Sequence, residues 1–158
     1  MDSIDSKNVY KELYALQDQV LDAVFAAESE FYLTGGTCLS RFYQAKRYSD
    51  HLDFFANDSP RFAFAQRNIR SALKDSHTFS VEVETKNFLR LIVDNKLQID
   101  FVNDVPNQFK DPIVTKKNYL IDTVENILAN KLTAVIGRDN PKDIFDIVLI
   151  HTYYSFSW

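Results

Sequence analysis

The sequence predicts an α+β fold, in which a small mixed β-sheet has helices packed on one side and is followed by C-terminal helices. Two observations lead to this prediction. Apolar residues recur at helical spacing near both ends of the chain, whereas the middle holds short segments of alternating or continuous apolar residues. A chain of 158 residues is long enough for one core, so we expect a single domain.

Five segments are expected to be helical. Residues 7–28 form an amphipathic helix whose apolar residues follow helical spacing: Val9, Leu13, Leu16, Val20, Val24 and Phe25. A second helix begins near Thr37, and a third follows Pro60, because proline suits the first turn of a helix. The fourth covers residues 122–137, and Asn140 is expected to cap the last one.

Five short segments are expected to be strands: 30–34, 51–55, 78–85, 88–93 and 96–102. The segment that follows, residues 103–118, contains two prolines and is expected to be a loop. The order of elements is therefore helix, strand, helix, strand, helix, a run of strands and two helices.

Composition restricts the class of protein. The net charge is −4 and the pI is near 5.3, so binding to RNA would require a local basic patch. The single cysteine, Cys38, allows no internal disulfide and fits a reducing compartment. No apolar run approaches the roughly 20 residues of a membrane span, and the first residues are acidic and polar, unlike a secretory signal. We therefore expect a soluble cytoplasmic protein with no membrane partner.

Two strands each offer a carboxylate. Alternation places Asp53 on the face opposite Leu52, and Asp100 on the face opposite Ile99. If the two strands are neighbours, these carboxylates meet and can hold a hard divalent cation. The alternative is that both are ordinary solvent-facing acids.

Gly35-Gly36-Thr37 lies between an expected strand and an expected helix. Paired glycines let the backbone approach a ligand closely, and the amides of a helix N-terminus suit a phosphate. The alternative is a tight turn without a ligand.

Lys131 lies within an apolar stripe, and Arg138 follows seven positions later on nearly the same face. A cation on the inward face of a helix needs an anionic partner. Two interpretations remain open. One is a structural ion pair with Asp143 or Asp146, and the other is a contact with a phosphate group.

The last helix is apolar nearly all round and is expected to be buried. A buried Asp146 would then need a partner. Asp143 lies three residues after the cap, where an acid complements the helix dipole, so a structural role is the simpler interpretation.

Four blocks of the sequence, in order, resemble the AbiEii/AbiGii toxin-type nucleotidyltransferases, the group that includes the MenT toxins: YLTGGTCLSRFY, RYSDHLDFF, LQIDFV and ENILANKLTAVIGRDNPKDIFDI. The resemblance runs from Phe31 to Ile150. It implies a single nucleotidyltransferase-like domain of the DNA polymerase β superfamily over residues 1–158. Residues 29–150 would be the family-like core, 1–28 an N-terminal helix and 151–158 an aromatic tail.

The resemblance also implies an activity. A nucleotidyl group would pass from a nucleoside triphosphate to an acceptor, such as the 3′ end of tRNA, with magnesium or manganese as the metal. Many members of this family are toxins of toxin–antitoxin or phage-defence pairs, so a cognate antitoxin is an expected partner.

The resemblance also implies roles for the residues that occupy the matching positions. Asp53 would be the second acid of an Asp-x-Asp pair, Asp100 the third acid, and His51 would stand beside them at the metal. The remaining residues form two sets. The expected nucleotide-binding residues are Gly35, Gly36, Thr37, Arg47, Ser49, Lys131 and Arg138. The expected catalytic residues are Asp53, Asp100, Lys131 and Asp146.

The sequence departs from the family pattern at one decisive position. His51 stands where the first Asp is usual, and Asp50 precedes it. Neighbouring residues of a strand point to opposite faces of the sheet, so Asp50 does not simply take the place of the missing first Asp. Imidazole is a poor magnesium ligand and suits softer metals. A descendant that binds nucleotides or proteins without catalysis is therefore the alternative to an active enzyme. Family members also commonly continue with further C-terminal helices.

Overall fold

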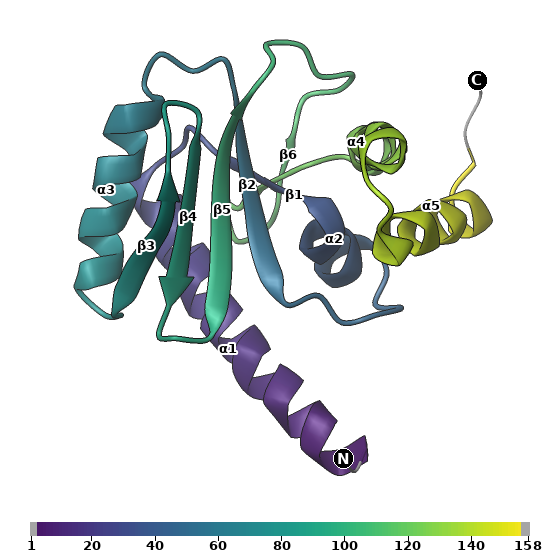
Figure 1. The fold of residues 1–158 in the computed structure, drawn as a ribbon, viewed down its shortest axis with the longest axis horizontal. Helices are drawn as coiled ribbons and strands as arrows, with labels where there is room; N and C mark the ends of the chain where they lie inside the picture. The colour runs from purple at the N-terminus through teal and green to yellow at the C-terminus, as the bar shows by residue number, and fades with distance from the viewer. Residues whose placement is uncertain (1–2, 156–158) are drawn as a thin grey trace.

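A seven-stranded mixed sheet organises the protein in the computed structural model, which describes residues 3–155 (Figure 1). The strand order is β3-β4-β5-β2-β1-β7-β6. The strands are β1 (Tyr32–Thr34), β2 (His51–Asn57), β3 (Phe79–Glu84), β4 (Phe88–Val93), β5 (Leu97–Asp104), β6 (Ile113–Val114) and β7 (Leu120–Ile121). β2 pairs in parallel with β5, and β1 in parallel with β7, whereas the other neighbours are antiparallel. The expected α+β class with a mixed sheet is confirmed.

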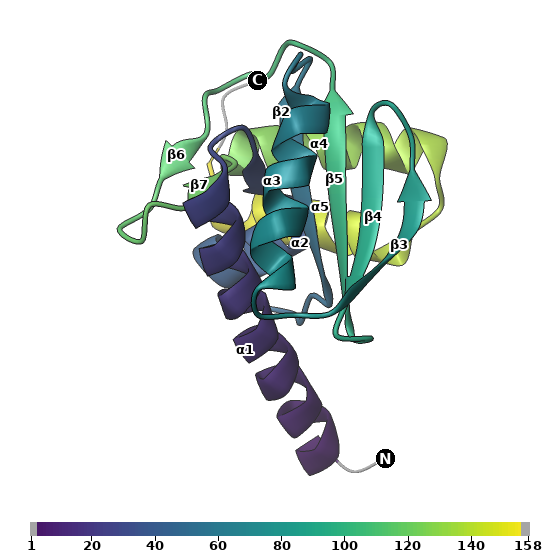
Figure 2. The same ribbon diagram turned by 90° about the vertical axis from the view of Figure 1, so that its left-hand side faces the viewer.

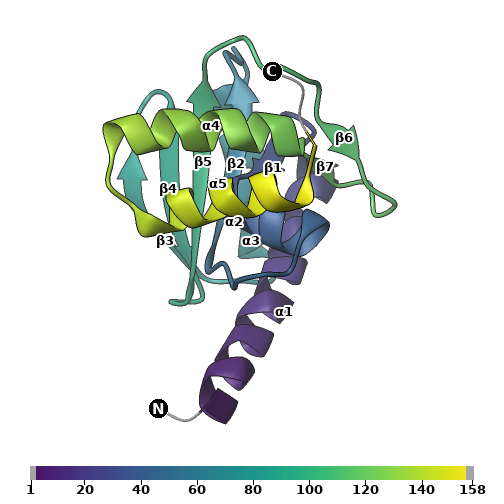
Figure 3. The same cartoon turned by 90° about the vertical axis from the view of Figure 1, so that its right-hand side faces the viewer.

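Helices lie on both faces of the sheet. The helical elements are α1 (Ser3–Ala27), α2 (Gly35–Cys38), the π-helical turn η1 (Leu39–Tyr43), α3 (Phe62–Lys74), α4 (Val124–Gly137) and α5 (Pro141–Tyr153). Helices α1 and α3 cover one face (Figure 2). Helices α4 and α5 run side by side across the other (Figure 3), so that face is the floor of a space between sheet and helices.

The core lies between the sheet and the helices α1 and α3. Alternate residues of β2 and β5 are buried, including Leu52, Phe54, Ile99 and Phe101. The rings of Phe54 and Phe101 stack at 5.1 Å. Full burial of such a side chain contributes about 1.5–3 kcal/mol. This apolar face fixes the register of both strands and turns their polar residues to the opposite side.

The second helix begins earlier than expected. It starts at Gly35, and Thr34 takes the extended N-cap position, so the two glycines form the first turn of α2. Gly35 has φ of +73°, a backbone conformation that favours glycine.

Two strands were missed in the sequence. Residues 103–118 were expected to be a loop, but β6 lies within that segment and β7 follows it. Each has only two residues, too few for an alternating pattern to be recognised. β7 pairs with β1 and thereby leads the chain into α4 beside the sheet.

The expectation that the last helix is buried was wrong. Helix α5 buries Asp143, Asp146 and Ile150, but several large apolar residues of α4 and α5 are exposed. They are Leu132, Val135, Ile136, Ile144, Phe145 and Val148. The ion pairs of the two acids, described below, determine which side of α5 faces inward, so that Ile150 is buried whereas Ile144, Phe145 and Val148 point away.

Residues 156–158 of the expected aromatic tail lie outside the described part of the chain, and α5 itself continues to Tyr153. Within residues 3–155, no helix combines the length and apolar character that a membrane span requires.

Candidate active site

Asp53 and Asp100 occupy directly paired positions on the neighbouring parallel strands β2 and β5. Both lie on the face opposite the core, and both line the space under α4. The two carboxylates are therefore brought together, as the alternation of each strand predicted.

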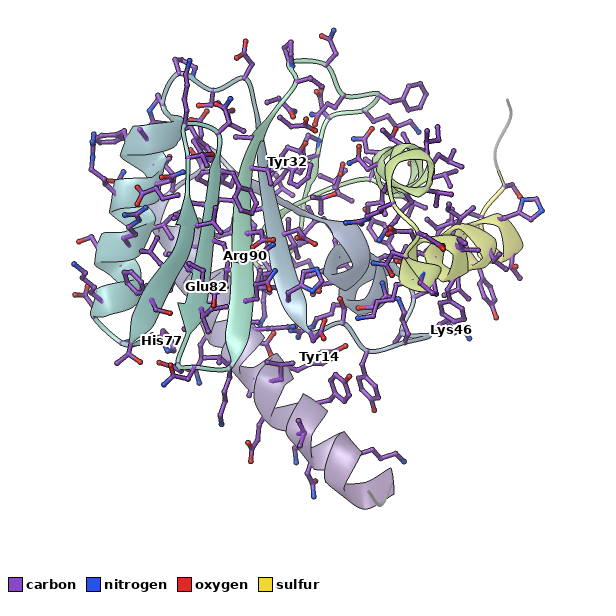
Figure 4. The ribbon with its side chains drawn as sticks, viewed as in Figure 1. Tyr14, Tyr32, Lys46, His77, Glu82 and Arg90 are labelled. Atoms are coloured by element: carbon purple, nitrogen blue, oxygen red, sulfur yellow. The ribbon has the colours of Figure 1, made fainter. Side chains whose placement is uncertain are left out.

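Each carboxylate already has a cationic neighbour. Nε2 of His51 lies 3.3 Å from Oδ2 of Asp53. Arg90 on β4 donates two hydrogen bonds to Asp100, from Nε at 2.8 Å and from Nη2 at 2.7 Å. Figure 4 labels Arg90 beside β5, the strand that carries Asp100. The negative charges of Asp53 and Asp100 are thus already offset by cationic side chains of the protein.

His51 carries a positive charge at neutral pH. Its hydrogen bond with Asp53, together with the nearby Asp50, raises the pKa of His51 to about 9, although burial acts in the opposite direction. Nδ1 of the ring lies 3.1 Å from Oδ1 of Asp50. Asp50 therefore remains next to His51 without taking its place on the strand face.

The two glycines make room for side chains of the site. A Cβ on Gly35 would lie 2.6 Å from Oδ2 of Asp53, and a Cβ on Gly36 would lie 2.4 Å from Nη2 of Arg47. Real Cβ atoms do not approach other atoms this closely, so any larger residue would displace Asp53 or Arg47. The diglycine is needed for the packing of the site, whether or not a phosphate also binds there.

Thr37 and Ser49 join α2 to β2. The Thr37 hydroxyl donates to the Ser49 hydroxyl at 2.7 Å and also contacts the carbonyl oxygen of His51. Thr37 is fully buried, so its side chain is not among those that face the cavities, whereas Ser49 reaches one of them.

Lys131 belongs to a buried ion-pair network between α4 and α5. Its Nζ lies 2.6 Å from Oδ1 of Asp143 and 3.1 Å from Oδ2 of Asp146. Arg138 donates to Oδ2 of Asp143 at 2.8 Å. Burial would raise the pKa of Asp143, but the hydrogen bonds from Arg138 and Lys131 outweigh it and hold that pKa below its ordinary value.

Arg47 completes this network from the first half of the chain. It donates to both oxygens of Asp146, from Nε at 2.7 Å and from Nη2 at 2.6 Å. The structural interpretation of Lys131 as an ion-paired residue is therefore correct. It does not exclude a contact with phosphate, because Lys131 also lines both cavities of the site.

Two cavities meet at the acid pair. The larger, of about 680 Å³, lies between the sheet and α4. The smaller, of about 250 Å³, lies towards Arg90 and α5. Four residues line both: Asp53, Asp100, Lys131 and Arg138. The smaller cavity is rich in cationic side chains: Arg47, His51, Arg90, Lys131, Arg138 and Lys142.

Asp53 and Asp100 could hold a metal, and His51 could join them only after it loses the proton that it shares with Asp53. Within residues 3–155, no group of three or more His, Cys, Asp or Glu side chains is arranged to hold a metal ion, so His51 is not placed as a third ligand beside the two carboxylates. If His51 lost its proton and turned to the metal, two carboxylates and one imidazole would form a mixed donor set, which fits manganese better than magnesium. Binding would also require Asp100 to share its oxygens with Arg90.

The smaller cavity is also lined by Arg90, Gln98 and Lys142, which are not among the expected site residues. Gln98 donates to Oδ2 of Asp100 at 3.2 Å. A signal for Arg90 was present, since it is the only charged residue in the apolar segment FLRLIV. Alternation places it opposite Leu89 and Leu91, on the same face as Asp100.

Known structures share this fold. Protein JHP933 from Helicobacter pylori matches 92% of this chain and 67% of its own, with a TM-score of 0.67 and 19% identity. ANT(2″)-Ia, solved in complex with adenylyl-2″-tobramycin, matches 87% of each chain with a TM-score of 0.66 and 13% identity. The Megavirus polyadenylate synthase matches 97% of this chain and 38% of its own, with a TM-score of 0.58 and 16% identity.

A comparison with curated protein sequences found no match. The model of one protein family, described as nucleotidyl transferase AbiEii toxin of a type IV toxin–antitoxin system, matches residues 19–157. This match covers most of the chain and includes all the site residues described above. The chain therefore belongs to the AbiEii nucleotidyltransferase toxin family.

Proposed function

We propose that the protein is a metal-dependent nucleotidyltransferase that moves a nucleotidyl group from a nucleoside triphosphate to an RNA acceptor such as tRNA. One observation supports this proposal above the others. Asp53 and Asp100 stand side by side at the junction of two cavities, facing Lys131 across the space. Membership in the family supports the reaction class.

The smaller cavity suits the triphosphate, because its cationic side chains would offset the charge of the phosphates. Lys131 and Arg138 are the proposed phosphate contacts, with Arg47, Ser49 and the backbone of Gly35 and Gly36 beside them. Asp146 would act through Lys131 and Arg47, whose charged groups it holds in place.

In the proposed reaction, a hydroxyl oxygen of the acceptor bonds to the α-phosphorus. The bond from that phosphorus to the bridging oxygen breaks, pyrophosphate leaves with the electron pair, and the hydroxyl proton passes to water. A divalent metal bound at Asp53 and Asp100, with His51 as a further ligand once it has lost its proton, would stabilise negative charge on the reacting oxygens. The protein contributes mainly positioning and charge neutralisation.

The biological role that we propose is that of a cytoplasmic toxin with a cognate antitoxin, in a toxin–antitoxin or phage-defence system. The family description is the support for this role. The structural match to a polyadenylate synthase is compatible with an RNA acceptor. At 16% identity, this match shows only that the two proteins share a fold.

A second function is favoured by the contacts of the two acids. His51 on Asp53 and Arg90 on Asp100 place protein cations where a catalytic metal would bind. A nucleotide-binding descendant without transferase activity would have such a site.

Transfer of label separates the two functions. The protein is incubated with each labelled nucleoside triphosphate and total RNA, in magnesium and separately in manganese. We expect transfer in manganese, its loss in Asp53→Ala, and a shift towards magnesium in His51→Asp. Transfer that survives Asp53→Ala would refute the site. Nucleotide binding without transfer in either metal would support the second function.

A further inference from the structure

The floor of the larger cavity is a ladder of paired residues that leads away from the two acids. Two pairs between β2 and β5 lie on this floor, Asp53 with Asp100 and Phe55 with Val102, and Asp104 ends it, whereas its partner Asn57 lines a separate small cavity. A strand rises about 3.3 Å per residue, so Asp104 lies roughly 13 Å along β5 from Asp100. The floor therefore changes from acidic to apolar and then to polar over a distance comparable to the length of a nucleoside.

Helix α4 forms the opposite wall. Ile127 and Ala134 face the same cavity as Phe55 and Val102, and Lys131 lies beside them at the acid end. The cavity is thus a slot with apolar walls, open to phosphate contacts at one end. A planar heterocyclic ring suits such a slot, because apolar and aromatic surfaces stack on its faces.

The far end of the slot offers an acceptor without a partner. Asn57 is engaged, since it accepts from the Tyr32 hydroxyl at 3.0 Å and donates to Gln108 at 2.8 Å. By contrast, the half-buried carboxylate of Asp104 lines the slot with no hydrogen bond from any residue in 3–155. Asn130 also lines this end, but an amide can donate as well as accept and so does not select between bases.

We propose that this slot holds the nucleoside of the triphosphate and that Asp104 selects cytosine over uracil through the amino group at position 4 of the base. An ionised carboxylate only accepts hydrogen bonds. Cytosine N4 and adenine N6 donate, whereas guanine O6 and the O4 that uracil shares with thymine accept. CTP is therefore preferred over UTP. This inference rests on the proposed function, because the phosphates must bind at the acid end.

Matched nucleotides test the inference directly. CTP and UTP differ in the group at position 4 of the base, and the protein is titrated calorimetrically with each in magnesium and in manganese. A hydrogen bond to a charged group contributes about 1.5–3 kcal/mol, so we expect CTP to bind about 10–100-fold more tightly than UTP.

The variant Asp104→Asn gives an opposite expectation for UTP. The asparagine amide can donate to O4 of uracil, so UTP should bind more tightly than to the wild type and the preference for CTP should disappear. Asp111→Asn, at an exposed acid outside the slot, is the control and should keep the preference. Circular dichroism and melting curves confirm that the variants are folded.

The outcomes separate the slot from the proposed function. Equal binding of CTP and UTP to the wild type overturns the base selection while leaving the transferase proposal in place. A preference that Asp104→Asn does not change also overturns the role of Asp104. If inorganic triphosphate and all four nucleotides fail to bind, both the slot and the proposed function are refuted.

Discussion

Arg47 and Asp146 are 99 positions apart in the sequence, yet they form a two-point ion pair at 2.6 and 2.7 Å. The pair attaches α5 to the segment before β2, and Lys131 joins the same carboxylate from α4. Asp146 is therefore the point at which three separate parts of the chain meet. Its burial means that each charge in the network depends on the others.

Asp146→Ala should destabilise the protein strongly, because it leaves Arg47 without its main partner and Lys131 with one partner fewer. Removing one member of a buried ion pair costs about 3–5 kcal/mol. Urea unfolding monitored by circular dichroism measures the change in the free energy of unfolding. The control Asp111→Ala alters an exposed acid and should change stability by less than about 0.5 kcal/mol. A loss below about 1 kcal/mol for Asp146→Ala would show that the network contributes little to stability.

Gly35→Ala and Gly137→Ala should behave in opposite ways. At Gly35 the backbone has φ of +73°, where an L-residue costs about 1–2 kcal/mol, and the new Cβ would also overlap Asp53. At Gly137 a Cβ meets nothing within 4 Å, and alanine favours a helix by roughly 0.5–1 kcal/mol. Unfolding measurements on both variants test this contrast. Equal stabilities would contradict the close approach of Gly35 and Asp53.

The acid pair could be predicted because strand alternation is a local rule. Leu52 and Phe54 define the core face of β2, and Ile99 and Phe101 define that of β5, so Asp53 and Asp100 had to point the other way. The position of Arg90 could be predicted in the same way. The short turn at Asp94–Lys96 joins β4 to β5 and thereby fixes the pairing of Arg90 with Asp100.

The orientation of α5 could not be predicted in this way. Its sequence has apolar residues on nearly every side, so periodicity does not identify an inward face. The inward face is instead determined by Asp143 and Asp146. Their partners are Lys131 on α4, Arg138 directly after α4, and Arg47 in the segment before β2. Such a choice depends on contacts distant in sequence, and local patterns carry no information about them.

His51 should titrate near pH 9 in the metal-free protein. The pKa is raised above the ordinary value of 6.5, chiefly by the hydrogen bond with Asp53. His51 therefore adds stability that is fully present below pH 6.5 and is lost as the pH rises through about 9. NMR of the imidazole protons in the presence of EDTA measures the pKa. Asp53→Asn should lower it, and an unchanged value would contradict the contact between the two residues.

Arg90→Leu should strengthen the binding of manganese. Arg90 engages both oxygens of Asp100, so a metal must compete with the guanidinium for that carboxylate. Removing a positive charge next to the metal also removes a repulsion, which solvent screening reduces because Arg90 is one third exposed. We expect the affinity for manganese to rise about tenfold, equivalent to about 1.4 kcal/mol. Electron paramagnetic resonance of free manganese measures this affinity without nucleotide or turnover.

Arg67→Leu, at an exposed arginine of α3 outside both cavities, is the control. Weaker binding in Arg90→Leu would mean that Arg90 holds Asp100 in position for the metal, and the competition between them would be refuted.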